Sequence, residues 1–150
     1  MDTDMEIIAV TDDAGRVLEA GWLEKAEAVH RQLRPQLPAD YAGRLREVFA
    51  AGGRMAIAAE DGAVVSVAVW RTVENTYEGR RFYVDDLVSD GARRSRGAGR
   101  LLFGWLETKA RSLGCSMLAL DSGVQRKDAH RFYFRERMAI ASFCFKKGLE

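Results

Sequence analysis

Hydrophobic residues recur along this chain with the three-to-four-residue spacing of a helix in four places. They predict helices over residues 16–33, 39–51, 99–113 and 128–137. Pro35 ends the first of these, because a proline disfavours helix at the residue before it. Gly114 follows the third, at the position where glycine commonly ends a helix.

Runs with strand propensity lie between these helices. The segment "RMAIAAEDGAVVSVAVW" (residues 54–70) predicts a hairpin, because Asp61 and Gly62 tolerate the positive φ angles of a tight turn. Its second arm is apolar on both faces, which indicates a sheet covered on both sides. A polar loop follows, and further strands are predicted near the N-terminus and at residues 80–89, 115–121 and 139–145. Because a helical crossover joins the strands 80–89 and 115–121, these two should be parallel neighbours in a mixed, mostly antiparallel sheet of an α/β fold.

The length and composition of the chain predict one ordinary domain that spans residues 1–150. The formal charge of +1 argues against a protein whose main task is to hold nucleic acid. Cys115 and Cys144 lack the spacing of metal ligands or of a disulfide framework, so we expect two buried, reduced thiols and no metal. The apolar runs are shorter than a membrane span and the N-terminus is acidic, so we expect a cytoplasmic protein that does not insert into membranes.

The loop "RRSRGAG" (residues 93–99) stands between a predicted strand and a predicted helix. The first amide groups of a helix have no acceptor within it, and the helix dipole favours an anion there. Gly97 and Gly99 allow a ligand to approach the backbone, and arginine forks suit phosphate oxygens. The loop lacks the Gly-Lys-Ser/Thr of a nucleotide P-loop and the third small residue of a dinucleotide fingerprint. It predicts a pyrophosphate cradle, with a solvated basic turn as the alternative.

The same loop resembles a family signature. Residues 94–99, "RSRGAG", are similar to the Arg/Gln-x-x-Gly-x-Gly/Ala motif of the Gcn5-related N-acetyltransferases (GNAT), and the order of predicted elements resembles that fold over nearly the whole chain. The segment "LDSGVQRKDAHRFY" resembles a bacterial histone-acetyltransferase-like subgroup without an assigned substrate. The resemblance implies a sheet of six to seven strands flanked by about four helices. Its parallel fourth and fifth strands would splay around acetyl-coenzyme A (acetyl-CoA).

The resemblance also implies which residues bind the cofactor. Leu87, Val88 and Ser89 would face the pantetheine and the acetyl carbonyl. One of Arg93, Arg94 or Arg126 would meet the 3′-phosphate. The phosphates would lie against Arg94, Ser95, Arg96, Gly97, Ala98, Gly99 and Arg100.

Acetyl transfer to an amine needs a group that takes a proton from the ammonium and one that returns a proton to the thiolate. Asp85 and Asp86 are candidates for the first role. As neighbours on a strand they should point to opposite faces, so that one faces the cleft. The alternative is that both are solvated at the edge of the strand or form ion pairs with Arg80 and Arg81. Tyr133, in "DAHRFYFRERM", matches the tyrosine that serves as the acid in many GNAT members. Arg137-Met138 stands where the family usually has Gly-Phe.

The sequence therefore predicts an acetyl-CoA-dependent N-acetyltransferase that acts directly on a primary amine of a small molecule or peptide. A non-catalytic acyl-CoA-binding regulatory module is the alternative. A nucleic-acid partner is not expected, because the basic loop has no stacking aromatic residues. The apolar segment 139–145 leaves two options open, pairing across a homodimer or a covered edge of the chain's own sheet.

Overall fold

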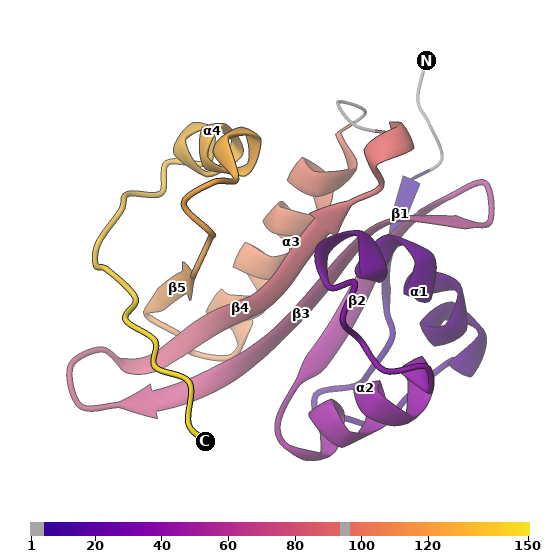
Figure 1. Cartoon of the computed structure of the whole chain (residues 1–150), viewed down its shortest axis with the longest axis horizontal. Coiled ribbons are helices and arrows are strands. Elements are labelled where there is room, and N and C mark those ends of the chain that lie inside the picture. The colour runs from indigo at the N-terminus through magenta and orange to yellow at the C-terminus, as the bar shows by residue number, and fades with distance from the viewer. Residues whose placement is uncertain (1–4, 94–96) are drawn as a thin grey trace. The chain divides into compact units, whose positions relative to one another are not determined.

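The computed structural model describes residues 5–93 and 97–150, which fall into two compact units, Met1–Ala119 and Leu120–Glu150 (Figure 1). The elements of the described residues are β1 (Met5–Ala9), α1 (Ala20–Leu33), α2 (Tyr41–Ala50), β2 (Arg54–Glu60), β3 (Ala63–Asn75), β4 (Gly79–Ser89), a 3₁₀ turn (Gly91–Arg93), α3 (Ala98–Ser112), β5 (Met117–Leu120) and α4 (Lys127–Arg135). None of the helices in this part of the chain is long and apolar enough to cross a bilayer.

The strands form one sheet in the order β1-β2-β3-β4-β5. The first four are antiparallel neighbours, while β5 follows the α3 crossover and runs parallel to β4. The α/β fold with a mixed, mostly antiparallel sheet is thus confirmed. At the β2–β3 turn, Asp61 and Gly62 both have positive φ, as the tight hairpin required.

Helices cover both faces of this sheet, as the two apolar faces of β3 predicted (Figure 1). On one face α1 and α2 bury side chains such as Leu23, Leu45 and Phe49 against Met55 and Val67. Helix α3 lies on the other face. It buries its own stripe of Ala98, Leu102, Phe103, Leu106 and Ala110, and its Trp105 contacts Trp70 of β3 edge to face.

One strand position breaks the regular pairing of β3 with β4. Val69 pairs with Asp86, whereas the next residue, Trp70, pairs with Val84, so Asp85 is the extra residue of a β-bulge. A bulge bends the strand locally and re-aims its side chains. The strict alternation of faces expected from the sequence therefore fails at this position.

The second unit, Leu120–Glu150, contains α4 and the C-terminal segment. Helix α4 ends with two hydrogen bonds, from the Met138 amide to the Tyr133 carbonyl and from the Arg137 amide to the Phe134 carbonyl, each 3.0 Å long. Arg137 has φ of 67° in this turn, a conformation that favours glycine. The chain thus keeps the left-handed turn at the position where the family usually has glycine.

Two expectations for this second unit are wrong. Residues 139–145 form no strand within the described parts of the chain, so the sheet has five strands and not six to seven. Ile140, Phe143 and Phe145 are 73% to 93% exposed, and Cys144 is exposed and not buried. An apolar run forms a strand only where a neighbouring strand supplies backbone partners, and the composition of a segment does not reveal that partner.

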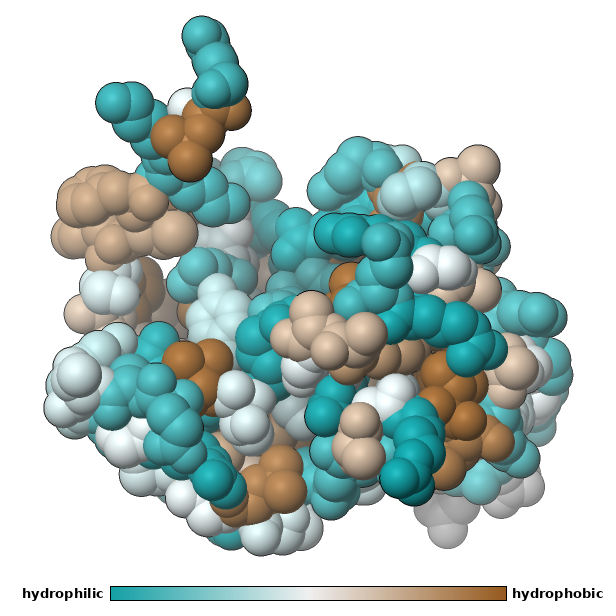
Figure 2. All heavy atoms as spheres, turned by 90° about the horizontal axis from the view of Figure 1, so that it is seen from below, coloured by the Kyte–Doolittle hydropathy of each residue, from teal (hydrophilic) through white to brown (hydrophobic). Residues whose placement is uncertain are grey.

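The surface is mixed in character. On the face shown in Figure 2, hydrophilic side chains predominate and interrupt the hydrophobic ones.

Candidate functional site

The N-terminus of α3 follows the end of β4 after a short connection. Arg94, Ser95 and Arg96 lie outside the described residues, so their predicted contacts with phosphate stay predictions. Gly97 is the N-cap residue of α3, with φ of 86°, and its carbonyl accepts the Leu101 amide at 2.9 Å. A Cβ built on Gly97 would meet nothing within 4 Å, so the backbone here is open to an approaching group.

These features fit a phosphate group. The amides of Ala98, Gly99 and Arg100 belong to the first turn of a 15-residue helix, where the helix itself offers no acceptor. The partial positive charge of the helix end favours an anion in the same place. The described residues supply no side-chain cap for α3. Backbone donors of this turn are therefore available to bind oxygen atoms of a pyrophosphate.

Contacts from α1 and β2 hold the end of β4 and the turn behind it. The Gln32 side chain accepts the Gly91 amide at 2.9 Å and donates to Asp90 Oδ1 at 3.1 Å. Arg93 lies 3.4 Å from the Glu60 carboxylate and 4.0 Å from that of Asp90. Arg93 is thus engaged with carboxylates, and its predicted contact with the 3′-phosphate stays a prediction.

The last residues of β4 are fixed through β3. Ser66 of β3 donates its hydroxyl to the Val88 carbonyl at 3.0 Å, and its Oγ lies 3.1 Å from Oγ of Ser89. Leu87 pairs with Ala68 in the same ladder. Leu87, Val88 and Ser89 therefore form an ordered end of β4 directly before the turn to α3. Their contact with pantetheine stays a prediction.

Asp85 and Asp86 both engage groups on the α1/α2 side of the sheet. Asp86 binds His30 and Arg34 of α1. Asp85 Oδ2 accepts two nitrogens of Arg71, at 2.8 and 2.6 Å. Arg71 follows Val67 and Val69 at every second position of β3, and those two valines lie in the core under α1 and α2. The prediction that the two aspartates point to opposite faces is wrong, because the bulge at Asp85 interrupts the alternation.

The alternative pairing with Arg80 and Arg81 is also wrong. Arg80 binds Glu74 at 2.8 Å and Arg81 binds Glu78 at 2.6 Å, both within the distal part of the β3–β4 hairpin. The two aspartates instead share Arg34, whose Nε donates to Asp86 Oδ1 at 2.7 Å and whose Nη2 donates to the Asp85 carbonyl at 3.0 Å.

A buried histidine completes the environment of Asp86. His30 is 1% exposed; its Nε2 lies 2.7 Å from Asp86 Oδ2 and its Nδ1 lies 2.8 Å from the Tyr41 hydroxyl. Burial raises the pKa of Asp86, but the hydrogen bonds and charges of His30 and Arg34 more than offset it, so the pKa lies below the ordinary aspartate value. Asp86 is therefore a carboxylate at neutral pH.

Tyr133, Arg126 and His130 belong to the second unit. Burial raises the pKa of Tyr133, although the charge of Arg126 and a hydrogen bond to it act in the opposite direction. Tyr133 is consequently a neutral phenol at physiological pH and suits an acid more than a base. His130 Nε2 lies 2.8 Å from the Gly123 carbonyl, which assigns that histidine a structural contact.

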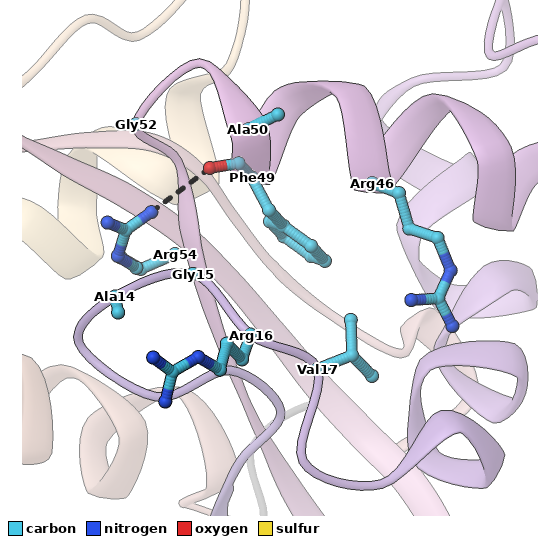
Figure 3. A pocket seen from close by; sticks show the side chains of 9 residues that line it. All are labelled: Ala14, Gly15, Arg16, Val17, Arg46, Phe49, Ala50, Gly52 and Arg54. Carbon is cyan, nitrogen blue, oxygen red and sulfur yellow. Dashed lines mark hydrogen bonds between the residues drawn. The ribbon is translucent and has the colours of Figure 1, made fainter.

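A separate open pocket of about 510 Å³ lies on the first unit (Figure 3). It is formed by the turn before α1 and the C-terminal end of α2. Arg54 Nη1 donates to the Phe49 carbonyl at 3.2 Å, and Arg46 lies across the pocket from Arg16 and Arg54 (Figure 3). Among the described residues, those predicted for cofactor binding or catalysis do not line it.

Sequence reasoning missed the polar residues that hold β4, the turn after it and the His30 ring: His30, Arg34, Tyr41, Arg71 and Gln32. One signal was present: His30 stands among the buried positions of α1, next to Val29 and four residues after Ala26. A buried histidine needs polar partners, and Arg34, four residues further on, is the C-cap residue of the same helix. Which strand would supply those partners depended on the fold.

The chain is similar in sequence to known acetyltransferases. Residues 17–138 match the model of the acetyltransferase (GNAT) family. The chain is 36% identical over 101 residues to the uncharacterized N-acetyltransferase YhdJ of Bacillus subtilis, covering 67% of this chain and 66% of that protein. It is also 36% identical over 66 residues to the aminoalkylphosphonate N-acetyltransferase of Salmonella typhimurium, covering 44% of this chain and 43% of that protein. The matches thus span about two thirds or less of these relatives.

Solved structures share the fold. An aminoglycoside N-acetyltransferase, AAC(6')-Iy, in complex with CoA superposes with a TM-score of 0.83 at 16% identity, covering 99% of this chain and 97% of that one. The glucosamine-6-phosphate N-acetyltransferase of Arabidopsis thaliana gives a TM-score of 0.75 at 19% identity, covering 97% and 99%. At these identities the likeness concerns the fold alone.

Proposed function

Because the chain belongs to the GNAT acetyltransferase family, we propose that it transfers the acetyl group of acetyl-CoA directly to a primary amine of a small molecule or peptide. The observation that carries this proposal is the open N-terminus of α3 at Gly97, directly beyond the strand that bears Asp85 and Asp86. An anion-binding turn and a pair of carboxylates on adjoining segments are what a phosphate-bearing donor and a cationic acceptor require.

Acetyl-CoA supplies an acetyl group activated as a thioester. In the reaction a carbon–nitrogen bond replaces the carbon–sulfur bond, the amine loses a proton and the sulfur gains one. The amides of Ala98, Gly99 and Arg100 bind phosphate oxygens, and Leu87 to Ser89 guide the pantetheine arm. Asp85 and Asp86 receive the acceptor ammonium, and one carboxylate takes its proton directly or through water. The Tyr133 hydroxyl donates the proton that the sulfur needs, consistent with its raised pKa.

The acceptor class follows from the charged groups next to the bulge. Asp85 and Asp86 attract an ammonium, while Arg34 and Arg71 stand beside them. Because the relative from Salmonella is named for aminoalkylphosphonates and the solved structures include aminoglycoside acetyltransferases, both amine classes belong in the first panel. Polyamines and peptides with a free amine complete it.

Release of free thiol from acetyl-CoA across this panel tests the proposal. We expect turnover with at least one amine, and acetyl-CoA should raise the melting temperature of the protein. Tyr133→Phe should lower kcat by at least tenfold while changing the affinity for acetyl-CoA little, because the hydroxyl acts on the leaving group and not on binding. Tyr77→Phe, at an exposed tyrosine of the β3–β4 turn, is the matched control and should leave kcat unchanged.

Two results would contradict the proposal. If acetyl-CoA gives no thermal stabilisation at saturating concentration, the cofactor assignment is wrong. If it stabilises the protein but no amine in the panel is acetylated, the result favours the alternative, an acyl-CoA-binding module that is not an enzyme.

A further inference from the structure

The end of α1 reaches β4 through a chain of polar groups, of which the proposed reaction uses only the last, Asp86. The Tyr41 hydroxyl, the His30 ring and the Asp86 carboxylate follow one another with contacts of 2.8 and 2.7 Å, and Arg34 binds the other oxygen of Asp86 at 2.7 Å. The three groups come from α2, α1 and β4, so the chain joins both helices of one layer to the sheet.

The direction of the hydrogen bond between His30 and Asp86 follows from chemistry. An ionised carboxylate can only accept, so Nε2 of His30 carries the hydrogen that is donated to Asp86. The other ring nitrogen, Nδ1, lies 2.8 Å from the Tyr41 hydroxyl. Burial and the nearby charges of Glu27 and Asp86 raise the pKa of Tyr41, so this hydroxyl keeps its proton. Tyr41 and Asp86 thereby hold the His30 ring in one orientation.

We infer that His30 is a positioning residue: with Arg34, it holds the Asp86 carboxylate ionised and in one orientation, as the anion that receives the acceptor's ammonium group. This inference rests on the function proposed above and names the residues that prepare one of its two carboxylates. Each oxygen of Asp86 accepts one donor from α1 and keeps a second acceptor direction. The side chain retains 14% exposure, so Asp86 is restrained without being closed off.

The neighbouring charges distinguish Asp86 from Asp85. The Asp85 side chain is 25% exposed, and its carboxylate binds one arginine, Arg71 of β3, through a single oxygen. Asp86 faces His30 and Arg34 from α1 and Tyr41 from α2, and Glu27 and Arg31 act on Tyr41 in turn. Of the two carboxylates, Asp86 is therefore the one whose two oxygens are both held by donor side chains.

The first test measures the pKa of the Asp86 carboxyl group directly. In protein with 13C-labelled aspartate carboxyls, the Asp86 resonance is assigned by its loss in Asp86→Asn and titrated by NMR. His30→Leu removes a donor at similar volume, and we expect the pKa of Asp86 to rise by about one unit or more. His30→Gln, which can still donate from its amide, should restore part of the difference. Arg34→Gln, at a partly exposed side chain, provides a second variant should His30→Leu fail to fold.

The second test asks whether catalysis follows the carboxyl group. The acid limb of kcat/KM for the acceptor should move to higher pH by the same amount as the Asp86 pKa, so that at a pH below both values the variant loses about tenfold per unit of displacement. Leu23→Ala, fully buried on the same helix, is the matched control. It should lower the melting temperature while leaving both the Asp86 pKa and the acid limb in place.

Each result has a distinct meaning. A rise in the Asp86 pKa with a matching shift of the acid limb supports the inference. An unchanged pKa overturns it, and so does a raised pKa with an unmoved acid limb, which would leave the His30 contact purely structural. If the wild-type protein acetylates no amine in the panel, the proposed function fails and this role of Asp86 fails with it, whereas the NMR titration still reports separately on the contact between His30 and Asp86.

Discussion

Alanine substitutions at two glycines, Gly97 and Gly104, should change the melting temperature of the protein in opposite directions. Both belong to α3 or its cap, and a Cβ built on either would meet nothing within 4 Å. Steric crowding therefore plays no part in the comparison. The difference lies in the backbone: Gly97 has φ of 86°, whereas Gly104 stands in the interior of the helix.

The magnitudes follow from that difference. Alanine at Gly97 must adopt a left-handed conformation, which costs about 1 kcal/mol. Alanine at Gly104 improves a helix interior by about 0.5–1 kcal/mol. For a chain of this size, 1 kcal/mol corresponds to about 2–4 °C in melting temperature. We thus expect Gly97→Ala to melt about 2–4 °C below the wild type and Gly104→Ala to melt above it by up to a similar amount.

Differential scanning calorimetry without ligand measures both shifts, and repeating it with acetyl-CoA adds a functional comparison. Gly97→Ala should reduce the stabilisation by acetyl-CoA, because the methyl group stands where the backbone is expected to meet phosphate. Gly104→Ala should keep the wild-type response. Ligand-free shifts of the same sign in both variants would refute the conformational argument, and an undiminished acetyl-CoA response in Gly97→Ala would refute the cradle.

Three further predictions concern stability. Arg137→Gly should raise the melting temperature by about 2–4 °C, because glycine adopts the left-handed turn after α4 without the cost of about 1 kcal/mol; a fall would contradict the strain ascribed to φ of 67°. Leu106→Ala, at a fully buried position of α3, should cost about 2–5 kcal/mol in urea unfolding; a loss below about 1 kcal/mol would contradict the packing of α3 on the sheet. Asp86 has a lowered pKa when folded, so its stabilisation is present above the unfolded value of about 3.9 and disappears as pH falls through the folded value. Unfolding free energies measured between pH 7 and pH 3 should therefore fall less steeply in Asp86→Asn than in the wild type, and equal slopes would contradict the ion pairing of Asp86.

Much of the fold followed from local pattern. Apolar spacing located all four helices to within about four residues at each end. Asp61-Gly62 fixed the β2–β3 turn. The start of α1 could not be located from apolar spacing. The predicted helix began at Arg16, but Val17 forms a bridge with Thr11 and the helix begins only at Ala20. Periodicity counts apolar residues and does not show which of them a turn uses.

The candidate site was predictable only in part for the same reason. The glycine at the N-cap of α3 and the two aspartates could be identified from their residue types and their order in the sequence. The bulge at Asp85 was not, because one unpaired residue leaves no mark on an apolar pattern and depends on the register with β3. The strand predicted at residues 139–145 is wrong for a different reason. Its composition suits a strand, but a strand needs a pairing partner that composition does not specify.

The final turn of α1 offers an unusual handle for protein engineering. His30, Gln32 and Arg34 occupy alternate positions there, and they hold Asp86, the Asp90–Gly91 turn and the Asp85 carbonyl respectively. A combinatorial library at these three codons would thus vary the groups that hold Asp86, the Asp85 carbonyl and the turn after β4, while the sheet residues themselves stay unchanged. If the proposed role of the two aspartates holds, substitutions in one helix end could change the amine preference without any change in β4.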